Sequence, residues 1–263
     1  PCVIINAFQI DDTPEIRKGL LYSMAIAAAI HVVLLVLSAL LSRPLKLDAV
    51  EQVNVVYSNA AALVIPLVKA LMGDAYVIYS CAFIIVQLVL LWTHASSLLQ
   101  GSSALDWKKV LTNINMIAIV AGALLYWFRV VLPAPLQNTM STVGNMMGPM
   151  GMLLAGMAIA EKPLREVFCT RRNYLPTVLR LVVCPLVVLV LLWGCHASSW
   201  VADGKNILMT VYLAAITPAC ATVTSMAQLY DRDAAHSSAL YVLTTLLSIV
   251  SMPVMIGLFD LLL

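Results

Sequence analysis

SNAAALVIPLVK, residues 58–69, interrupts an otherwise apolar segment about halfway along its length with polar residues and a proline. TPACATVTSMAQ, residues 217–228, does the same in a second segment, at a constant offset of 159 residues. An aspartate follows each segment at that same offset, Asp74 and Asp233. Broken helices at equivalent places in two halves of a chain indicate the binding site of an inverted-repeat secondary transporter.

The composition indicates that the whole chain lies in a membrane. Of its 263 residues, 62% are hydrophobic and only 11% are charged, which is too few charges for the surface of a soluble domain of this length. Runs of about 18 or more apolar residues, long enough to cross a ~30 Å hydrocarbon core, recur along the sequence. We therefore predict an all-α polytopic membrane protein.

Other classes of function lack their sequence signals. The net charge of +2 gives no indication of a nucleic-acid surface. The six cysteines are scattered, mostly in apolar stretches, without CxxC or Cys/His spacing, so we interpret them as packing residues and expect no metal site. Motifs of metalloproteases, serine hydrolases, P-loop proteins and dinucleotide-binding enzymes are absent from the sequence, so we expect neither an enzyme nor a bound cofactor.

Eight full membrane spans are predicted after a half-span at the N-terminus. Pro1–Ile10 is apolar but too short to cross, and we interpret it as the second half of a helix whose beginning is absent. The predicted full spans are Ile16–Leu41, Val50–Leu71, Ala75–Leu99, Val110–Leu132, Thr142–Ala160, Leu175–Trp193, Asn206–Leu229 and Ala235–Leu262.

The distribution of charge predicts the orientation of these spans. If the connection after Leu41 is cytoplasmic, ten of the 15 lysines and arginines collect on the cytoplasmic side, in agreement with the positive-inside rule. This orientation places the C-terminus on the extracytoplasmic side. We expect a multi-pass protein of the cell (plasma) membrane.

The spacing of the two interrupted spans predicts an inverted repeat. They are five spans apart, and an odd interval requires that the second copy is inserted upside down. Extending the repeat unit backwards requires one and a half more helices before Pro1. The intact architecture would be ten helices, five plus five inverted, of which this chain carries about eight and a half.

The two breaks are the candidate substrate site. A break in lipid frees backbone groups and is tolerated only where it is buried or lines a wet cavity. The half-helix after each break presents free N–H groups and its positive dipole end near the membrane midplane, which suits an anion such as a carboxylate. The candidate contacts are Asn59, Ser58, Pro66, Thr217, Pro218, Thr222 and Ser225. The alternative is that the prolines only kink ordinary membrane helices.

Several other polar residues have two interpretations each. His31, near the middle of its span, could carry a coupling proton or could be a neutral histidine hydrogen-bonded between helices. Lys69 and Gln228 occupy equivalent positions beyond the breaks, and Lys69 could contact an anion or extend to the outer interface. Arg180 is expected to anchor a cytoplasmic helix end. Interhelical hydrogen bonds are expected of Gln87, Asn113, Asn115 and Asn145.

A glycine-rich stretch, residues 144–156, contains a GxxxG pair at Gly144 and Gly148. Such a pair permits two helices to approach closely. We expect either ordinary close packing or a pliable scaffold helix that faces the substrate path.

The first interrupted span resembles a known family. Residues 59–73 are similar to the first crossover helix of the auxin efflux carrier family, which includes the plant PIN-type carriers, in their Asn-to-Pro spacing and in the pattern Pro-Leu-x-Lys-Ala. Pro218–Tyr230 resembles the second crossover of that family, the span with Pro253 resembles its last helix, and Arg180 to Pro185 resembles its eighth. The similarity extends along the whole chain.

The resemblance implies a ten-helix fold with two crossing broken helices, shared with bile-acid-type sodium symporters and NhaA, and an elevator-like movement that carries small organic anions. Asn59 and the two proline breaks carry over as substrate-site positions. The implied division is residues 1–10 (scaffold), 11–99 (transport domain, crossover helix 50–71), 100–160 (scaffold) and 161–263 (transport domain, crossover helix 206–229).

Two departures from the plant carriers bear on the substrate. Val223 stands where they usually have a second proline, and only residues 100–109 stand where they have a long hydrophilic loop, which favours a microbial-type carrier of a carboxylate such as malate or malonate over auxin. Two alternatives stay open: a sodium-coupled organic anion symporter of the same fold, and a membrane sensor or scaffold that does not transport. The expected partners are a small organic anion and the lipid bilayer, with a homodimer left open and no nucleic acid.

Overall fold

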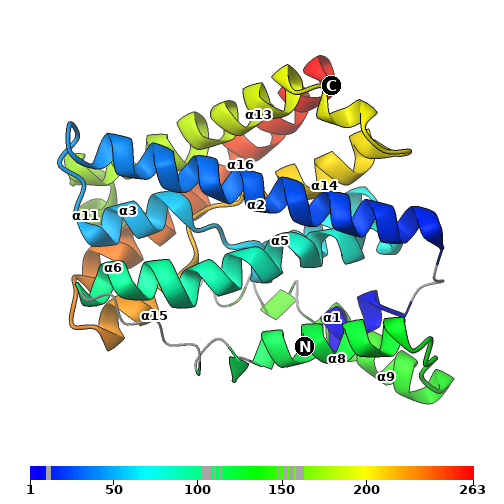
Figure 1. Ribbon diagram of the computed structural model, residues 1–263. Coiled ribbons are helices and arrows are strands. Elements are labelled where there is room, and N and C mark those ends of the chain that lie inside the picture. Colours follow the sequence, from blue (N-terminus) through cyan, green and yellow to red (C-terminus); the bar gives the residue numbers. More distant parts are fainter. Residues whose placement is uncertain are drawn as a thin grey trace.

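The computed structural model describes residues 1–9, 13–101, 108, 111–112, 114–146, 149–150, 153, 157 and 163–263. All regular elements in these residues are helices (Figure 1), which confirms the all-α prediction. Predictions that lie outside the described residues concern Ile10, most of the 100–109 connection, Asn113, Gly148 and most of the span Thr142–Ala160.

Among the described residues, four helical segments are long and apolar enough to cross a membrane, and their ends lie within four residues of the predicted ones. Two are single helices, α2 (Pro14–Ser42) and α16 (Ala234–Leu262). The other two are continuous but change their helical type on the way. The span Asp74–Gln100 contains η2 (Asp74–Tyr76), α5 (Val77–Leu90), η3 (Leu91–Ala95) and α6 (Ser96–Gln100), and the span Arg171–Gly194 contains η4 (Arg171–Asn173), α12 (Tyr174–Val178), η5 (Leu179–Val183) and α13 (Cys184–Gly194).

The two interrupted spans are each divided into two half-helices, as the sequence predicts. In the first, α3 (Ala49–Val56) ends before the break and a π-helical turn, η1 (Ala60–Val64), leads into α4 (Ile65–Leu71) after it. In the second, α14 (Gly204–Ile216) precedes the break and α15 (Ala221–Leu229) follows it. Each half-helix is therefore too short to cross a membrane alone.

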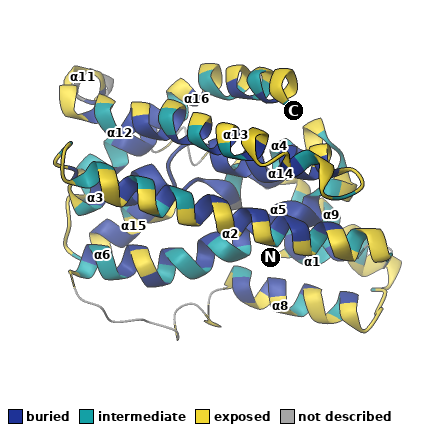
Figure 2. Ribbon diagram, turned by 45° about the horizontal axis from the view of Figure 1, so that its top comes forward, coloured by how far each residue is buried: buried dark blue, intermediate teal, exposed yellow. Residues whose placement is uncertain are grey.

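The helices α5 and α14 form the buried centre of the main bundle, and α2 lies beside them. α2 packs along α5, and α14 contacts both of them, while α13, α16, α3 and α15 complete the bundle around the two breaks. Buried residues are concentrated on α5 and α14 (Figure 2). The outer faces expose large apolar side chains, among them Leu40 of α2 and Ile249 of α16. Such faces are stable against lipid, as expected for a polytopic membrane protein.

A second group of helices, α1 (Cys2–Ala7), α8 (Ile114–Trp127) and α9 (Ala134–Asn145), lies together below α5 in the view of Figure 1. α1 packs against both α8 and α9. Two glycines permit this close packing, because an added Cβ at Gly122 would lie 2.5 Å from the Phe8 ring and one at Gly144 would lie 2.6 Å from Val3. The expectation of close packing at Gly144 is confirmed.

Two predicted boundaries are wrong: α8 ends at Trp127, five residues before the predicted end of its span at Leu132, and α9 begins earlier than predicted. The sequence pattern starts a span at Thr142, with the prolines before it in a connection, whereas α9 already begins at Ala134. The reason is that Pro135 lies in the first turn of the helix, where a proline removes no hydrogen bond and its fixed φ suits the helix. The remaining helices, α11 (Leu164–Cys169) and η6 (Ala197–Ser199), are short elements in the connections.

Candidate functional site

The two interrupted spans cross at their breaks and are joined by their backbones. Ser58 and Ala219 form an isolated antiparallel bridge. Two backbone hydrogen bonds flank it, from Asn59 N–H to Pro218 O at 2.8 Å and from Cys220 N–H to Tyr57 O at 3.1 Å. The structure thus contains the crossing of two broken helices that the sequence predicts. In this arrangement α15 and the helix formed by η1 and α4 both begin two residues beyond the bridge.

Side chains from neighbouring helices satisfy further backbone groups of the bridged pair. The Ser58 N–H and hydroxyl both donate to Gln87 Oε1, at 3.2 and 2.6 Å, and Gln87 Nε2 donates back to the Ser58 carbonyl at 2.7 Å. The Ala219 N–H donates to Thr244 Oγ1 of α16 at 3.2 Å. Because water does not reach the bilayer core, these bonds replace the partners that a helix would have supplied. The interhelical hydrogen bond predicted for Gln87 is confirmed.

Arg180 lies behind the crossing and contradicts its sequence prediction. The expectation was an anchor near a cytoplasmic helix end, but the side chain is 1% exposed and comes from η5, close to the middle of the span Arg171–Gly194. Its guanidinium donates five hydrogen bonds to four backbone carbonyls, those of Val55, Val56, Ala215 and Thr217, at 2.6–3.2 Å. The prediction failed because the helical span begins at Arg171, earlier than the apolar run suggests, which places position 180 deep inside.

Pro66 does not produce the first break. The helix resumes at Ala60, and Pro66 lies six residues later, in the first turn of α4. The backbone leaves the helix at Tyr57, Ser58 and Asn59 instead. Pro66 follows the π-helical turn η1, in which the usual spacing of backbone hydrogen bonds is changed, so its missing N–H is accommodated there.

The predicted contact residues divide into a buried and an exposed set. Ser58, Asn59, Thr217 and Pro218 are buried at the crossing. The Thr217 hydroxyl donates to the Ala214 carbonyl at 3.0 Å, whereas the Asn59 side-chain amide has no hydrogen-bond partner among the described residues. Two further residues on the first turns of α15, Thr222 and Ser225, are exposed in the described structure.

A groove separates the half-helix α4 from the second group of helices. It encloses about 210 Å³ between Pro66 and Lys69 of α4, Asn6 of α1, and Ser141 and Asn145 of α9. A wider hollow of about 500 Å³ adjoins it and shares Asn6, Lys69 and Ser141. Of the predicted contacts, Pro66 and Lys69 line this groove, and the residues of the crossing do not.

Lys69 makes defined contacts rather than pointing away from the protein. Its Nζ lies 2.9 Å from Asp74 Oδ1 and donates to Asn145 Oδ1 of α9 at 3.2 Å. The interhelical hydrogen bond predicted for Asn145 is thereby confirmed. Gln228, the residue of the second repeat that corresponds to Lys69, is exposed on α15. The equivalent positions of the two repeats therefore have different surroundings.

His31 is fully buried in α2, against the ring of Phe83, with the ring centroids 4.5 Å apart. Its Nδ1 lies 2.8 Å from the Ala27 carbonyl of its own helix. Its Nε2 is buried without a hydrogen-bond partner among the described residues. The structure places His31 in the bundle interior, and its role in proton coupling stays a prediction.

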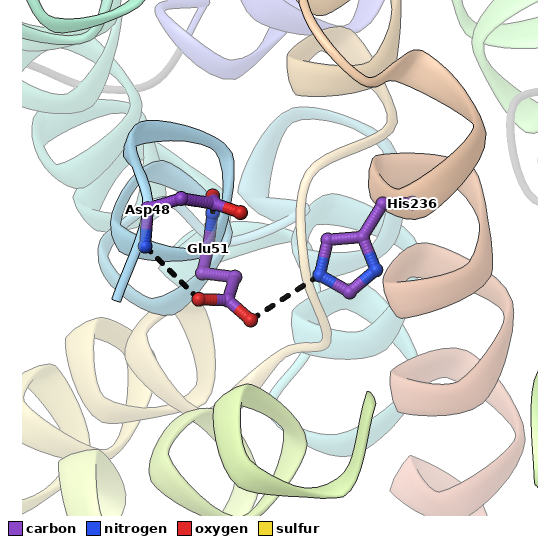
Figure 3. A group of neighbouring side chains, drawn as sticks. All are labelled: Asp48, Glu51 and His236. Carbon is purple, nitrogen blue, oxygen red and sulfur yellow. Dashed lines mark hydrogen bonds and ion pairs between the residues drawn. The ribbon is translucent and has the colours of Figure 1, made fainter. Parts of the chain in front are cut away.

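A second polar cluster, not foreseen from the sequence, surrounds the fully buried carboxylate of Glu51 (Figure 3). Both oxygens of Glu51 accept hydrogen bonds from the Arg172 guanidinium, and His236 Nε2 lies 3.3 Å from Oε1. Asp48 and Glu51 form a capping box at the start of α3, in which the Asp48 N–H donates to Oε2 at 3.0 Å and the Glu51 N–H donates to Asp48 Oδ1 at 2.8 Å. The cluster thus joins the starts of α3 and α16 to η4.

This cluster has donor atoms of the kind that bind metal ions, since one atom each from Asp48, Glu51 and His236 lie within 4.8 Å of one another. However, the guanidinium of Arg172 already engages both Glu51 oxygens. An ion pair of this kind serves to connect elements. The signal that could have revealed it is the sequence Asp48-x-x-Glu51 at the start of an apolar span, which is a capping-box pattern.

A family model described as "Membrane transport protein" matches residues 102–256, more than half of the chain. The matched region includes Arg180 and the whole second interrupted span, and it begins after the first. No curated protein matches this chain significantly.

Proposed function

Since the chain belongs to the membrane transport protein family, which is the auxin efflux carrier family, we propose that it is a secondary active or facilitative carrier of small organic anions such as carboxylates. The observation that carries this proposal is the backbone bridge between Ser58 and Ala219. It brings the N-terminal ends of two half-helices together inside a protein whose described part contains four full-length apolar spans.

The chemistry of the crossing favours an anion. Helix N-termini carry a positive partial charge and free N–H groups, and the half-helices that begin at Ala60 and Ala221 present two of them near one point. Asn59 adds an amide whose donors have no partner among the described residues. In our proposal the substrate carboxylate binds these groups, together with the exposed hydroxyls of Thr222 and Ser225.

The proposed movement is a displacement of the crossing relative to the group formed by α1, α8 and α9. The two broken helices are bonded to each other and, through Gln87 and Arg180, to α5 and η5, so they are suited to move as one body. The groove beside Pro66 and Lys69 lies where that body faces α1 and α9. This supports a division into a moving part, residues 11–99 and 161–263, and a scaffold, residues 1–10 and 100–160.

The test is uptake of labelled organic acids into proteoliposomes that contain the full chain. The panel should include mono- and dicarboxylates, with malate and malonate among them. We expect saturable uptake of at least one acid, and its loss in Asn59→Ala. Because the Asn59 side chain makes no hydrogen bond to another described residue, the variant should retain its melting temperature and its yield in the membrane.

The matched control is Asn138→Ala, which removes the same amide from an exposed position of α9. Uptake by this variant should equal that of the unchanged protein. Normal uptake by Asn59→Ala would show that the assigned site is wrong, and absence of uptake for every acid would refute the carrier function.

A further inference from the structure

The buried guanidinium of Arg180 binds where the two half-helices that precede the breaks come to an end. Val55 and Val56 are the last residues of α3, and Ala215 and Thr217 flank the last residue of α14. The carbonyls of these four residues accept five hydrogen bonds from Arg180, which equals the number of N–H donors that a guanidinium has.

No carboxylate pairs with Arg180 in the described part of the chain, so its charge is balanced by backbone dipoles. Each helix C-terminus carries a negative partial charge of about half an elementary charge, together with carbonyls that lack intrahelical partners. Two such ends converge on Arg180, and their sum is about one negative charge. The single positive charge of the guanidinium matches it.

Carbonyls of this kind are also the usual ligands of a coupling cation. In secondary transporters with broken helices, the backbone carbonyls of the unwound segment and the C-terminal ends of the half-helices coordinate the coupling ion, which is sodium or a proton. Here the carbonyl oxygens of Val55, Val56, Ala215 and Thr217 converge in the same manner, but a side chain of the protein occupies the position between them.

We propose that Arg180 is a permanent internal cation that takes the place of a coupling metal ion at the crossing, so that transport by this chain is independent of sodium. The inference rests on the proposed carrier function and specifies its ion dependence. Because the charge of Arg180 cannot leave, the C-terminal ends stay compensated throughout the cycle. The positive N-terminal ends at Ala60 and Ala221 then remain available for an anion.

The first experiment replaces sodium chloride by choline chloride, since choline is too large to enter the space between the four carbonyls that bind Arg180. We expect the unchanged protein to keep both its melting temperature and its uptake of organic acids. A requirement for sodium in either measurement would overturn the proposal. The melting temperature needs no substrate, so this test remains decisive even if no organic acid is transported and the carrier function itself fails.

The second experiment removes the guanidinium from between the four carbonyls by the substitution Arg180→Ala. The variant is then titrated with guanidinium chloride or sodium chloride in the millimolar range. If the carbonyls form a cation site, a small cation should stabilise the variant, by about 3 °C at tenfold its dissociation constant, while choline should not. Equal responses to all three salts would mean that Arg180 only fills space. Arg43→Ala, at an exposed position after α2, is the control and should respond to none of them.

A third variant covers the case in which Arg180→Ala does not fold. Arg180→Lys retains the positive charge but can donate only three hydrogen bonds. It should melt at a lower temperature than the unchanged protein and should remain insensitive to sodium. If the lysine variant became dependent on sodium, the charge at this position would not be the reason for sodium independence, and the proposal would fail.

Discussion

Gln87 of α5 and Ser58 at the first break, 29 positions apart, are joined by three hydrogen bonds, so that one side-chain amide satisfies both backbone groups of a residue outside any helix. Removal of this amide by Gln87→Ala should leave a buried N–H and a buried carbonyl without partners. Each such group costs about 1–3 kcal/mol, so the melting temperature in detergent should fall strongly.

Two further variants distinguish the loss of the hydrogen bonds between Gln87 and the Ser58 backbone from other effects of a substitution. Ser58→Ala removes only the hydroxyl and retains both backbone bonds to Gln87, so its loss of stability should be clearly smaller. Gln228→Ala removes an exposed amide and should have almost no effect. Equal melting temperatures for Gln87→Ala and Gln228→Ala would contradict the role assigned to Gln87.

The ion pair between Glu51 and Arg172 should contribute to holding α3 and η4 together. The Glu51 carboxylate is buried but the Arg172 side chain is 42% exposed, so water screens part of the charge and the loss of Arg172 should cost less than the about 3–5 kcal/mol of a fully buried pair. Arg172→Met should therefore destabilise the protein measurably, because the buried Glu51 carboxylate loses its partner, and adding Glu51→Gln to it should recover part of the loss. The measurement is a double-mutant cycle based on thermal unfolding.

An exposed ion pair provides the reference for this cycle. Lys205 and Asp260 lie 3.7 Å apart with both side chains about half exposed, and pairs of this kind contribute little to stability. Lys205→Met should not change the melting temperature measurably. Additive effects of Arg172→Met and Glu51→Gln would show that these two residues are not energetically coupled.

Gly122 of α8 packs so closely against Phe8 that no side chain should fit at position 122. A Cβ at position 122 would lie 2.5 Å from the Phe8 ring, so Gly122→Ala should displace α1 and lower the melting temperature. Combining it with Phe8→Ala should relieve the clash, although the double variant loses the contact of Phe8 with Tyr126. Gly257→Ala, where nothing lies within 4 Å, is the control and should be neutral or slightly stabilising.

The surroundings of His31 predict that a phenylalanine ring, which has no nitrogen, can replace the imidazole. His31→Phe removes a buried Nε2 that has no partner in the described residues, and it places a second apolar ring beside Phe83. The variant should fold with a melting temperature close to that of the unchanged protein. We also expect the pH profile of uptake to remain the same. A variant that folds but no longer transports would instead assign His31 a part in coupling.

The fold was predictable where the signal is local or repeated. Long apolar runs define the four full spans, and the offset between SNAAALVIPLVK and TPACATVTSMAQ identifies the two breaks without any knowledge of their contacts. The crossing follows, because freed backbone groups in lipid must find partners, and the corresponding groups of the other repeat are suited to supply them.

The partners of the breaks could not be predicted, because they depend on tertiary packing. An arginine at position 180 has the same local sequence whether it extends to the membrane surface or lies inside the protein. Its position was decided by where the span begins, and helix ends are poorly marked when polar residues such as Arg171 and Asn173 belong to the helical segment. Pro66 was misleading for a related reason, since a proline in a first turn is compatible with a helix.

The crossing also has a consequence for the biogenesis of the protein. Gln87 follows Ser58 by only 29 residues, but Arg180 follows Val55 by 125, and Pro218 is made later still. When the first broken helix leaves the ribosome and enters the membrane, the residues that bind the end of α3 have not yet been translated. A chain stopped before Arg180 would therefore hold an unfinished break in the bilayer, and synthesis of the second half completes the folding of the first.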